Sequence, residues 1–588
     1  MRALLGSCGT DTTAPVGPAG AVHDPSSGAW LAVAGNPVWA VESAGGERGE
    51  PLARRLLDAL LKNGVEALNH LDGSFALAWW NPASSTLSLL RDRFGIEPLH
   101  YAVHDGRVIF GSGARDVVRA RGVPPRISHQ GLVEFLTYCF LPGSCTLFEG
   151  IVRVPPGSLL EWRPGGLPPV VRRWYRLSFA NPWSDPEATL ASRYRELLEA
   201  SVARRLGAGR PGVFLSGGMD SSSVATFMHR WLTAPLASFS FRCGGTSFDE
   251  SAYARELARE LGTTHTEILF DEEQALTMLD SVRSMDTPFC DIGIEIGTWL
   301  LARAAAGKVD YVLTGDGGDE LWASHPVYAA QRIIQWYDRM PIPAAARRAL
   351  VRALDLTRDS DRKRGLAVVL KRIVPSPDLP TTLRHFRWRM YYTPDALAGL
   401  LAGPAGLLAR EAGAFQPVLD SFEGYDGPAD GISIGLYSDY QTACGFYFSR
   451  LLLARSFGIE VGLPFYDRAL VEFGARIPAR RKLEGVERTK RLFRMAMEGV
   501  LPDVINHRKD KLGNSVPLKN WLRGNGRLSQ LVRETLESPS FLDRGLFRPE
   551  VVRRMLVEHG SRRHNHSHRL WALFVLEQWM RLNFDEAS

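Results

Sequence analysis

The chain has 588 residues and a formal net charge of +6, with 45% hydrophobic and 23% charged residues. This composition is ordinary for a soluble globular protein and excludes a disordered chain, a collagen-like fibre and a coiled coil. The charge is mild for this length, so it permits binding to phosphates or acidic peptides without indicating a nucleic-acid partner.

No apolar run approaches the ~20 residues that span a bilayer, so we expect no membrane partner. The N-terminal MRALLGSCGT lacks the full h-region and the cleavage site of a signal peptide. The six cysteines form no CxxC pair, so neither a zinc site nor a disulfide framework is indicated. Together these features predict a cytoplasmic protein.

The first part of the chain is predicted to be a β-rich layered domain. Short β-like runs alternate there with Gly, Pro, Asn and Asp; examples are 74–80, 86–90, 108–110 and 158–162. Around 181–186 the composition changes and a helical pattern begins, with Tyr194, Leu198 and Val202 on one face. We therefore expect two domains, 1–182 and 183–588.

From residue 213 the pattern alternates between strands and helices. Strands are predicted at 213–215, 236–241 and 309–313, and a helix at 219–232 has a buried face made of Val224, Phe227, Met228 and Trp231. A capping box from Ser247 to Glu250 predicts the start of another helix. Repeated β–α units imply an α/β fold with a parallel sheet, and ligands then lie at the carboxyl ends of the strands. From 325 onward the pattern is mostly helical and includes a basic segment, Arg358–Arg372.

The segment LSGGMDSS, Leu215 to Ser222, has the pattern of an anion site. A predicted strand ends, two glycines turn the chain and a helix begins, so successive backbone N–H groups point into one concavity. Ser216, Ser221 and Ser222 add hydroxyl donors. Asp220 would repel a phosphate unless a metal lay between them, which predicts that it is a Mg²⁺ ligand. A plain glycine turn with an Asp N-cap is the simpler alternative.

A second turn, TGDGGDE at Thr314 to Glu320, directly follows the predicted strand 309–313. Its carboxylates, Asp316, Asp319 and Glu320, repel one another and need a cation. Asp319 and Asp220 both follow strands of one predicted sheet, which allows them to share a metal. The alternative is an acidic turn exposed to solvent.

These turns resemble the motifs SGGxDS and GxGxDE of the asparagine synthetase B superfamily of pyrophosphatase-loop synthetases. Further segments are similar to the family pattern: 239–241, 248–250, 261–265, Glu460–Asp467, Lys490–Arg494, Arg508–Lys511, Pro517 and 570–579. The resemblance covers nearly the whole chain. It implies an N-terminal Ntn-type α/β/β/α sandwich and a C-terminal parallel-sheet synthetase domain of the adenine-nucleotide α-hydrolase-like type, with a helical extension.

The resemblance implies that a carboxylate is activated by ATP as an acyl-adenylate, with Mg²⁺, and is then attacked by an amine. Lys490 would neutralise charge in the transition state, and Asp316 and Glu320 are the other catalytic candidates. Asp220 and Asp319 are the expected metal ligands. The expected nucleotide-binding residues are Leu215, Ser216, Gly217, Gly218, Asp220, Ser221, Ser222, Phe241, Thr314, Gly315 and Arg494, with Arg508 and Lys511 as weaker candidates.

The first domain is similar to the family's glutamine amidotransferase domain at 71–76, 91–99 and 155–157. Active members place a cysteine directly after the initiator Met, whereas this sequence has Arg2 there, and it also lacks their Arg-Gly-Pro-Asp segment. Cys8 lies beyond the matched position and is interpreted as structural or incidental. We therefore expect a degenerate glutaminase that hydrolyses no glutamine, so that the amine comes from a substrate.

Two branches of the superfamily look like this, the β-lactam synthetases and the lasso-peptide macrolactam synthetases. β-Lactam synthetases carry a tyrosine where this sequence has Asp316, and asparagine synthetases carry an arginine where it has Gly462. The greater similarity to a lasso cyclase implies an isopeptide bond between an Asp or Glu side chain and the N-terminal amine of a ribosomal peptide. Ammonia-dependent amide ligation, β-lactam formation and a non-catalytic peptide-binding scaffold are the alternatives.

That resemblance also implies a leader-cleaved core peptide as substrate, and a leader-peptide protease and a recognition protein as partners. A basic and aromatic stretch, Leu383–Tyr392, suits an acidic peptide, although ordinary helix packing explains it equally well. Four histidines, His559, His564, His566 and His568, look like a metal tract, but no carboxylate or cysteine completes the set, so we expect a solvated segment.

Overall fold

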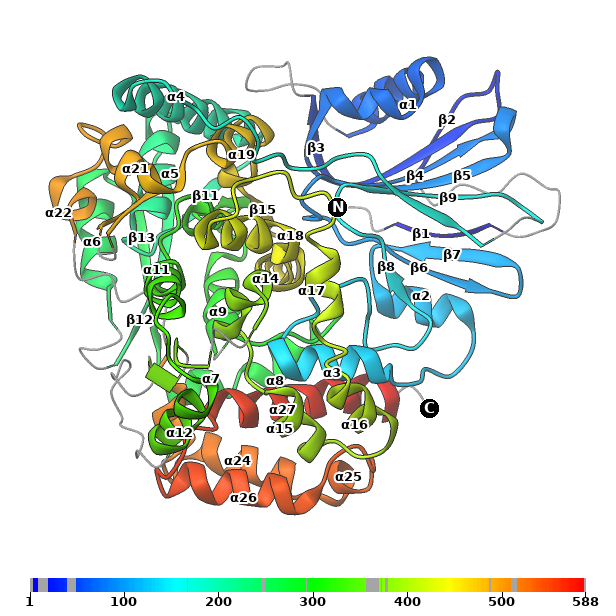
Figure 1. Cartoon of the computed structure of the whole chain (residues 1–588). Helices are drawn as coiled ribbons and strands as arrows, with labels where there is room; N and C mark the ends of the chain where they lie inside the picture. The colour runs from blue at the N-terminus through cyan, green and yellow to red at the C-terminus, as the bar shows by residue number, and fades with distance from the viewer. Residues whose placement is uncertain are drawn as a thin grey trace.

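The computed structural model describes residues 4–8, 20–39, 49–165, 168–244, 249–291, 293–355, 370–371, 373–375, 379–485, 488–508 and 516–585. Arg2, Ser247, Lys511 and most of the segment Arg358–Arg372 lie outside the described residues, so the predictions that rest on them stay predictions. Figure 1 shows an N-terminal unit of two stacked sheets beside a larger unit that surrounds a parallel sheet.

The N-terminal unit has four layers, in the order helix, sheet, sheet, helix (Figure 1). The smaller sheet has the order β1 (Leu5–Cys8), β7 (Arg107–Gly111), β6 (His100–His104), β8 (Val152–Arg153). The larger has the order β10 (Val170–Arg173), β9 (Ser158–Trp162), β5 (Thr86–Arg91), β4 (Leu71–Asn81), β3 (Trp30–Trp39), β2 (Val22–His23). Helix α1 (Glu50–Asn63) packs on the larger sheet and α2 (Ala114–Arg121) on the smaller. These elements confirm the predicted sandwich and its four predicted strands.

Alternating side chains of β4 fill both sides of the larger sheet. Ala76, Ala78 and Trp80 pack between the two sheets, whereas Leu77 and Trp79 pack toward α1. Successive residues of a strand point to opposite faces, so this nearly continuous apolar run is buried on both.

The larger unit is built on five parallel strands, which confirms the predicted α/β class. Their order is β13 (Thr264–Phe270), β12 (Ala237–Cys243), β11 (Pro211–Phe214), β14 (Tyr311–Leu313), β15 (Glu460–Gly462). Val213 and Leu313 belong to the core on one face, and Phe214 and Val312 to the core on the other. Both faces are therefore covered, as a parallel sheet requires.

Helices cover both faces of this sheet and continue below it. The helices used below are α4 (Glu187–Arg205), α5 (Met219–Trp231), α6 (Ser251–Glu260), α9 (Ile294–Ala305), α10 (Gly318–Leu321), α11 (Pro326–Asp338), α15 (Pro394–Leu400), α18 (Gly431–Leu451), α21 (Arg491–Ala496), α26 (Pro549–Gly560) and α27 (Ser567–Met580). Helix α27 is buried almost throughout and contacts α3 (His129–Tyr138) of the N-terminal unit. The last helix of the chain therefore ties the two units together.

Ion pairs and caps also join the two units. The Arg455 guanidinium donates to both carboxylate oxygens of Glu97, at 2.8 and 2.5 Å. Asp286 accepts the N–H groups of Ala114 and Arg115, the first residues of α2, at 2.7 and 3.0 Å. An acidic side chain at a helix N-terminus satisfies donors that have no acceptor within the helix. The units therefore share a specific interface.

Two expectations need correction, and one open alternative is decided in part. Trp231 is 53% exposed, because the buried stripe of α5 ends at Met228, one turn before the helix does. For the stretch Leu383–Tyr392, the structure favours the helix-packing alternative; its buried members are Leu383, His385, Phe386, Met390 and Tyr392. His559 and His566 are buried rather than solvated, and His566 Nε2 lies 2.8 Å from Glu558 Oε2. In the described part of the chain, no three His, Cys, Asp or Glu side chains form a metal site.

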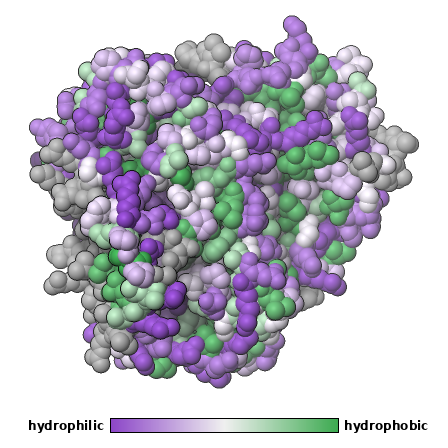
Figure 2. Space-filling view, viewed as in Figure 1, coloured by the Kyte–Doolittle hydropathy of each residue, from purple (hydrophilic) through white to green (hydrophobic). Residues whose placement is uncertain are grey.

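On the face drawn in Figure 2, hydrophobic side chains form small islands among hydrophilic ones. None of the described helices is long and apolar enough to cross a membrane.

Candidate active site

The first turn begins where β11 ends. The N–H of Leu215 donates to Phe239 O at 2.8 Å, which ties the end of β11 to β12. Gly217 has φ +72°, and a Cβ there would lie 2.6 Å from Ala254 N and from Tyr253 Cβ in α6. Only glycine fits both this conformation and this contact. The turn is therefore pressed against α6 before the chain enters α5.

Serine hydroxyls shape the inside of this turn. Ser221 Oγ accepts the N–H of Ser216 at 3.1 Å and lies 3.0 Å from Ser216 Oγ. The N–H of Gly218 donates to Ser216 Oγ at 3.3 Å, and Ser222 Oγ is buried without a hydrogen-bond partner. Since the first N–H groups of a helix have no acceptor within it, the start of α5 and these hydroxyls form a concavity suited to phosphate oxygens.

The second turn packs directly on the first. A Cβ at Gly315 would lie 2.4 Å from Ser221 N, and a Cβ at Gly318 would lie 2.2 Å from Asp220 Oδ1. Strands β11 and β14 are neighbours in the sheet, so their carboxyl ends emerge side by side. Glycine at both positions lets the two turns touch, and this brings Asp220 next to Asp319.

Lys490 closes the site from a third element. It precedes α21 in the left-handed region, at φ +58°, and only 3% of it is exposed. Its Nζ contacts both carboxylate oxygens of Asp220 and lies 2.7 Å from Asp319 Oδ1. Ion pairs of this kind are also charge-assisted hydrogen bonds, which are stronger than neutral ones. The structure therefore brings together a lysine and two carboxylates that lie far apart in the sequence.

Each of the three carboxylates of the second turn lies beside a basic residue. Asp316 pairs with Arg450 from α18, Asp319 with Lys490, and Glu320 with His325, whose Nε2 lies 2.8 Å from Glu320 Oε1. The repulsion that the sequence predicts is thus relieved by the protein's own side chains. Sequence reasoning missed Arg450 and His325; His325 lies just beyond the motif, whereas no local signal marks Arg450.

Asp220 and Asp319 fit the Mg²⁺ ion that the sequence predicts. Mg²⁺ usually takes one or two carboxylates from the protein and its other ligands from phosphates and water. Both carboxylates face one point, since each contacts the cationic Nζ of Lys490. The two carboxylates would hold the ion, which would neutralise phosphate charge beside Lys490.

Comparison with known proteins agrees with this geometry. The family model described as asparagine synthase matches residues 193–581, and the glutamine amidotransferase domain model matches residues 53–175. The chain belongs to the asparagine synthase family. Members of this family are ATP-dependent carbon–nitrogen ligases that form AMP and pyrophosphate, and this chain is an enzyme of that class.

Relatives align along most of the chain. A Mycobacterium tuberculosis protein named "Putative asparagine synthetase (glutamine-hydrolyzing)" is 28% identical over 88% of this chain and 77% of its own length. Asparagine synthetase (glutamine-hydrolyzing) 1 of Bacillus subtilis is 24% identical over 89% and 79%. Amidase chry2 of Gibberella zeae is 27% identical over 82% and 76%. A solved allosteric regulatory enzyme of purine biosynthesis aligns over 43% of this chain and 62% of its own, at 11% identity and a TM-score of 0.19, too low to support a conclusion.

Three other residues of the predicted nucleotide set lie in or near this site. Thr314 is buried, and its Oγ1 accepts the N–H of Asp316 at 3.4 Å inside the turn. The Phe241 ring packs edge-on against Phe270, with centroids 5.7 Å apart. Arg494 donates to main-chain carbonyls, at 3.2 Å for Thr489 O, and so braces the segment that carries Lys490. Binding of ATP by these residues stays a prediction.

Arg508, a weaker candidate, is engaged on α6. It pairs with Glu250 and its guanidinium lies 3.8 Å from the ring centroid of Tyr253. Because Tyr253 packs against Gly217, this pair braces the first turn from behind.

The described part of the N-terminal unit offers no reactive thiol. Cys8 lies at the end of β1 and is buried, and burial raises the pKa of its thiol to about 12. Burial likewise raises the pKa of Cys145 to about 12. The thiolate is the nucleophilic form of cysteine, so neither side chain suits a glutaminase.

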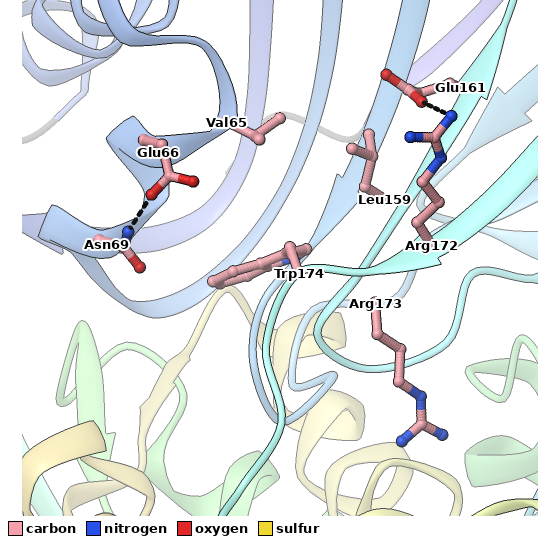
Figure 3. Close-up of a pocket in the computed structure, with 8 residues that line it drawn as sticks. All are labelled: Val65, Glu66, Asn69, Leu159, Glu161, Arg172, Arg173 and Trp174. Carbon is pink, nitrogen blue, oxygen red and sulfur yellow. Dashed lines mark hydrogen bonds and ion pairs between the residues drawn. The ribbon is translucent and has the colours of Figure 1, made fainter. Parts of the chain in front are cut away.

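The N-terminal unit also contains a pocket of about 250 Å³, drawn in Figure 3. It lies between η1 (Gly64–His70) and strands β9 and β10, and its lining residues are Val65, Glu66, Asn69, Leu159, Glu161, Arg172, Arg173 and Trp174. Its carboxylates are partnered within the lining, Glu66 with Asn69 at 2.8 Å and Glu161 with Arg172 at 3.4 Å. The lining contains no cysteine, serine or threonine, so it supplies no hydroxyl or thiol nucleophile.

Proposed function

We propose that this enzyme closes an isopeptide macrolactam in a ribosomal peptide of the lasso type. It adenylates an Asp or Glu side chain with ATP and Mg²⁺, and the peptide's own N-terminal amine attacks the adenylate. The proposal names one substrate for the carbon–nitrogen ligase activity of the family. Its support comes from Lys490 and its carboxylate partners, from the cysteines of the N-terminal unit, and from Gly462, where asparagine synthetases carry an arginine.

One contrast carries the proposal. In the synthetase site, Asp220 and Asp319 are assembled around Lys490, whereas Cys8 and Cys139 of the N-terminal unit are buried and Cys145 is half-buried with a raised thiol pKa. A ligase without a glutaminase thiol receives no ammonia from glutamine, so the nitrogen comes from free ammonia or from an amine substrate, and we favour the amine of the peptide.

Gly462 supports a substrate other than free aspartate. It lies in β15 opposite Leu313, and a Cβ there would lie 2.4 Å from Leu313 Cδ2. The arginine that asparagine synthetases carry would therefore have to displace the Leu313 side chain here. An amino acid recognised through that arginine would lose its partner here.

The roles of the site residues follow from their positions. The first turn, at Ser216–Ser221, would hold the phosphates that leave as pyrophosphate. Lys490 is oriented by Asp220 and Asp319 and would offset the charge that develops as the adenylate forms. Asp316 and Glu320 stand on the other side of the second turn, with partners of their own. They are the candidates to receive the proton of the attacking amine.

The test is pyrophosphate release from ATP in the presence of a panel of carboxylates. The panel comprises a leader-cleaved core peptide with an Asp or Glu at ring-forming distance, free aspartate and a β-amino acid. We expect release with the core peptide, together with a product lighter than that peptide by one water. Release with aspartate and ammonia alone, without lactam, would refute the proposal.

The second candidate is an amide ligase that uses free ammonia. The names of the Mycobacterium tuberculosis and Bacillus subtilis relatives favour it, because both are called asparagine synthetases. Conversion of aspartate to asparagine by ammonium salts in the same panel would establish it.

A further inference from the structure

Arg450 is the cationic partner of a carboxylate in the second turn. It stands in the last turn of α18, and its side chain is 9% exposed. The guanidinium pairs with Asp316 Oδ1, across 134 residues of sequence. Among the described residues, no other side chain pairs with the Asp316 carboxylate.

The two ion pairs of the second turn point to different elements. Asp319 turns toward Lys490 and Asp220, on the side of the first turn. Asp316 turns toward α18, and its side chain remains 19% exposed. The second turn therefore directs the Asp319 carboxylate toward the predicted phosphate site and the partly exposed Asp316 carboxylate toward α18.

The surroundings of Arg450 are buried and of mixed charge. Asp291, at the turn before α9, is a second carboxylate, and it interacts electrostatically with Arg450 and also with Arg389 and His325. A guanidinium has fixed donors in a planar fork, so it can hold a carboxylate in one orientation. Lysine would keep the charge at this position but not the fork.

We propose that Arg450 is a positioning residue that aims the Asp316 carboxylate at the attacking amine. The inference rests on the proposed function. In that step the amine nitrogen bonds to the acyl carbon, the bond from that carbon to the AMP oxygen breaks, and AMP leaves. The amine's proton passes to the Asp316 carboxylate. Arg450 touches no reacting atom and acts through Asp316.

The test separates the two half-reactions with four variants: Arg450→Met, Arg450→Lys, Asp316→Asn and the Arg450→Met, Asp316→Asn double variant. Exchange of labelled pyrophosphate into ATP with the core peptide measures adenylation, and mass spectrometry measures lactam. We expect Arg450→Met to lower kcat for lactam about 100-fold while exchange stays within about threefold and KM is unchanged. Arg450→Lys should recover part of the loss, and the double variant should lose no more than Asp316→Asn alone.

A purely structural role gives a different pattern. Exchange and lactam would then fall together, or the two losses would multiply in the double variant, and either result overturns the inference. Arg455→Met is the matched control, because Arg455 pairs with Glu97 between the units and should leave the ratio of the two half-reactions unchanged.

Failure of the proposed function would look different again. The wild-type enzyme would then give no exchange with the core peptide but would show it with another carboxylate of the panel. The same four variants are then measured on that carboxylate and its amine, where the selective loss in the second half-reaction is still expected. Its absence there overturns the role of Arg450 as well.

Discussion

Two loops of this molecule match motifs of the same family and use them in opposite ways. In the N-terminal unit, Arg91 and Asp92 of the segment Arg91–Leu99 hydrogen-bond to the main chain, and Glu97 of the same segment pairs with Arg455 of the other unit. Arg91 is 1% exposed and donates to Glu97 O, Gly95 O and Val154 O at 2.6, 2.7 and 2.7 Å. Every donor nitrogen of this side chain is used to hold the loop.

Asp92, the next residue of that segment, also hydrogen-bonds to the main chain. It accepts N–H groups from four residues, Phe75, Phe94, Ile96 and Glu97, at 2.8 to 3.3 Å. In the synthetase unit, by contrast, Asp220 and Asp319 pair with Lys490, just before α21, and Asp316 pairs with Arg450 of α18. A motif match therefore indicates a structural role for the segment Arg91–Leu99 and a candidate active site at the second turn, Thr314–Glu320.

The largest effect on activity is expected from removing the charge of Lys490, and it tests whether the synthetase unit carries the chemistry. We expect Lys490→Met to lower pyrophosphate exchange at least about 1000-fold, because the charge on the phosphate side loses its cation. Lys482→Met is the matched control. Lys482 is also buried, and burial lowers its pKa to about 7, so a neutral side chain should be accepted there. Equal losses in the two variants would contradict the special role of Lys490.

Gly318→Ala tests the contact between Asp220 and Lys490 by a steric change alone. The new Cβ would lie 2.2 Å from Asp220 Oδ1, so the carboxylate has to move away from Lys490. We expect exchange to fall about 100-fold, since a small misplacement of a catalytic group costs that much. Gly399→Ala in α15 meets nothing within 4 Å and should keep full activity. Unchanged exchange in Gly318→Ala would show that contact between the turns is unimportant.

Arg91→Met tests the other loop. Removing the guanidinium leaves three buried carbonyls without donors, which should cost about 3–5 kcal/mol of unfolding free energy. Chemical denaturation measures that loss. The folded fraction should keep the wild-type exchange rate, because this loop takes no part in the chemistry. A stable variant with impaired exchange would reverse the comparison.

The smallest effect is a pH dependence that arises at Asp92. Burial raises the pKa of this carboxyl from its ordinary 3.8 to about 6, against the hydrogen bonds that lower it. The protonated form is thus favoured in the fold, so its contribution to stability is full below pH 4 and is lost as the pH rises through 6. The loss is about 3 kcal/mol at 1.36 kcal/mol per pKa unit.

Asp92→Asn removes this titration. The stability difference between the wild type and the variant should fall by about 3 kcal/mol between pH 4 and pH 7, as measured by urea unfolding. Asp58→Asn, on the exposed face of α1, is the control for loss of a charge. A difference independent of pH would mean that Asp92 is ionised throughout this range.

Much of the fold and part of the site could be predicted from local patterns. Periodicity and turn residues predict the strands. Each of the two glycine-rich turns is one continuous segment, so its candidate site residues can be recognised within a short stretch of sequence. Parallel pairing then places both turns at one edge of the sheet. Lys490 carries no local signal and was predicted through the family motif alone.

The parts that sequence could not predict depend on contacts between distant segments. Arg450 meets Asp316 only because α18 ends beside the second turn. The basic stretch Leu383–Tyr392 left peptide binding and helix packing equally open in the sequence, and in the structure His385 and Arg389 pair with Asp439, which is fully buried. Burial raises the pKa of Asp439, but Arg389, His385 and Tyr328 outweigh it, so the net shift is downward. Charge alone therefore does not reveal exposure when its partner is remote.

The central claim is that the nitrogen of the new bond comes from the peptide. The most direct measurement supplies the enzyme with ATP, Mg²⁺, a leader-cleaved core peptide and ¹⁵N-labelled glutamine and ammonium, and weighs the product. We predict a cyclic product that has lost one water and contains no ¹⁵N. A linear peptide amide that carries ¹⁵N would contradict the account.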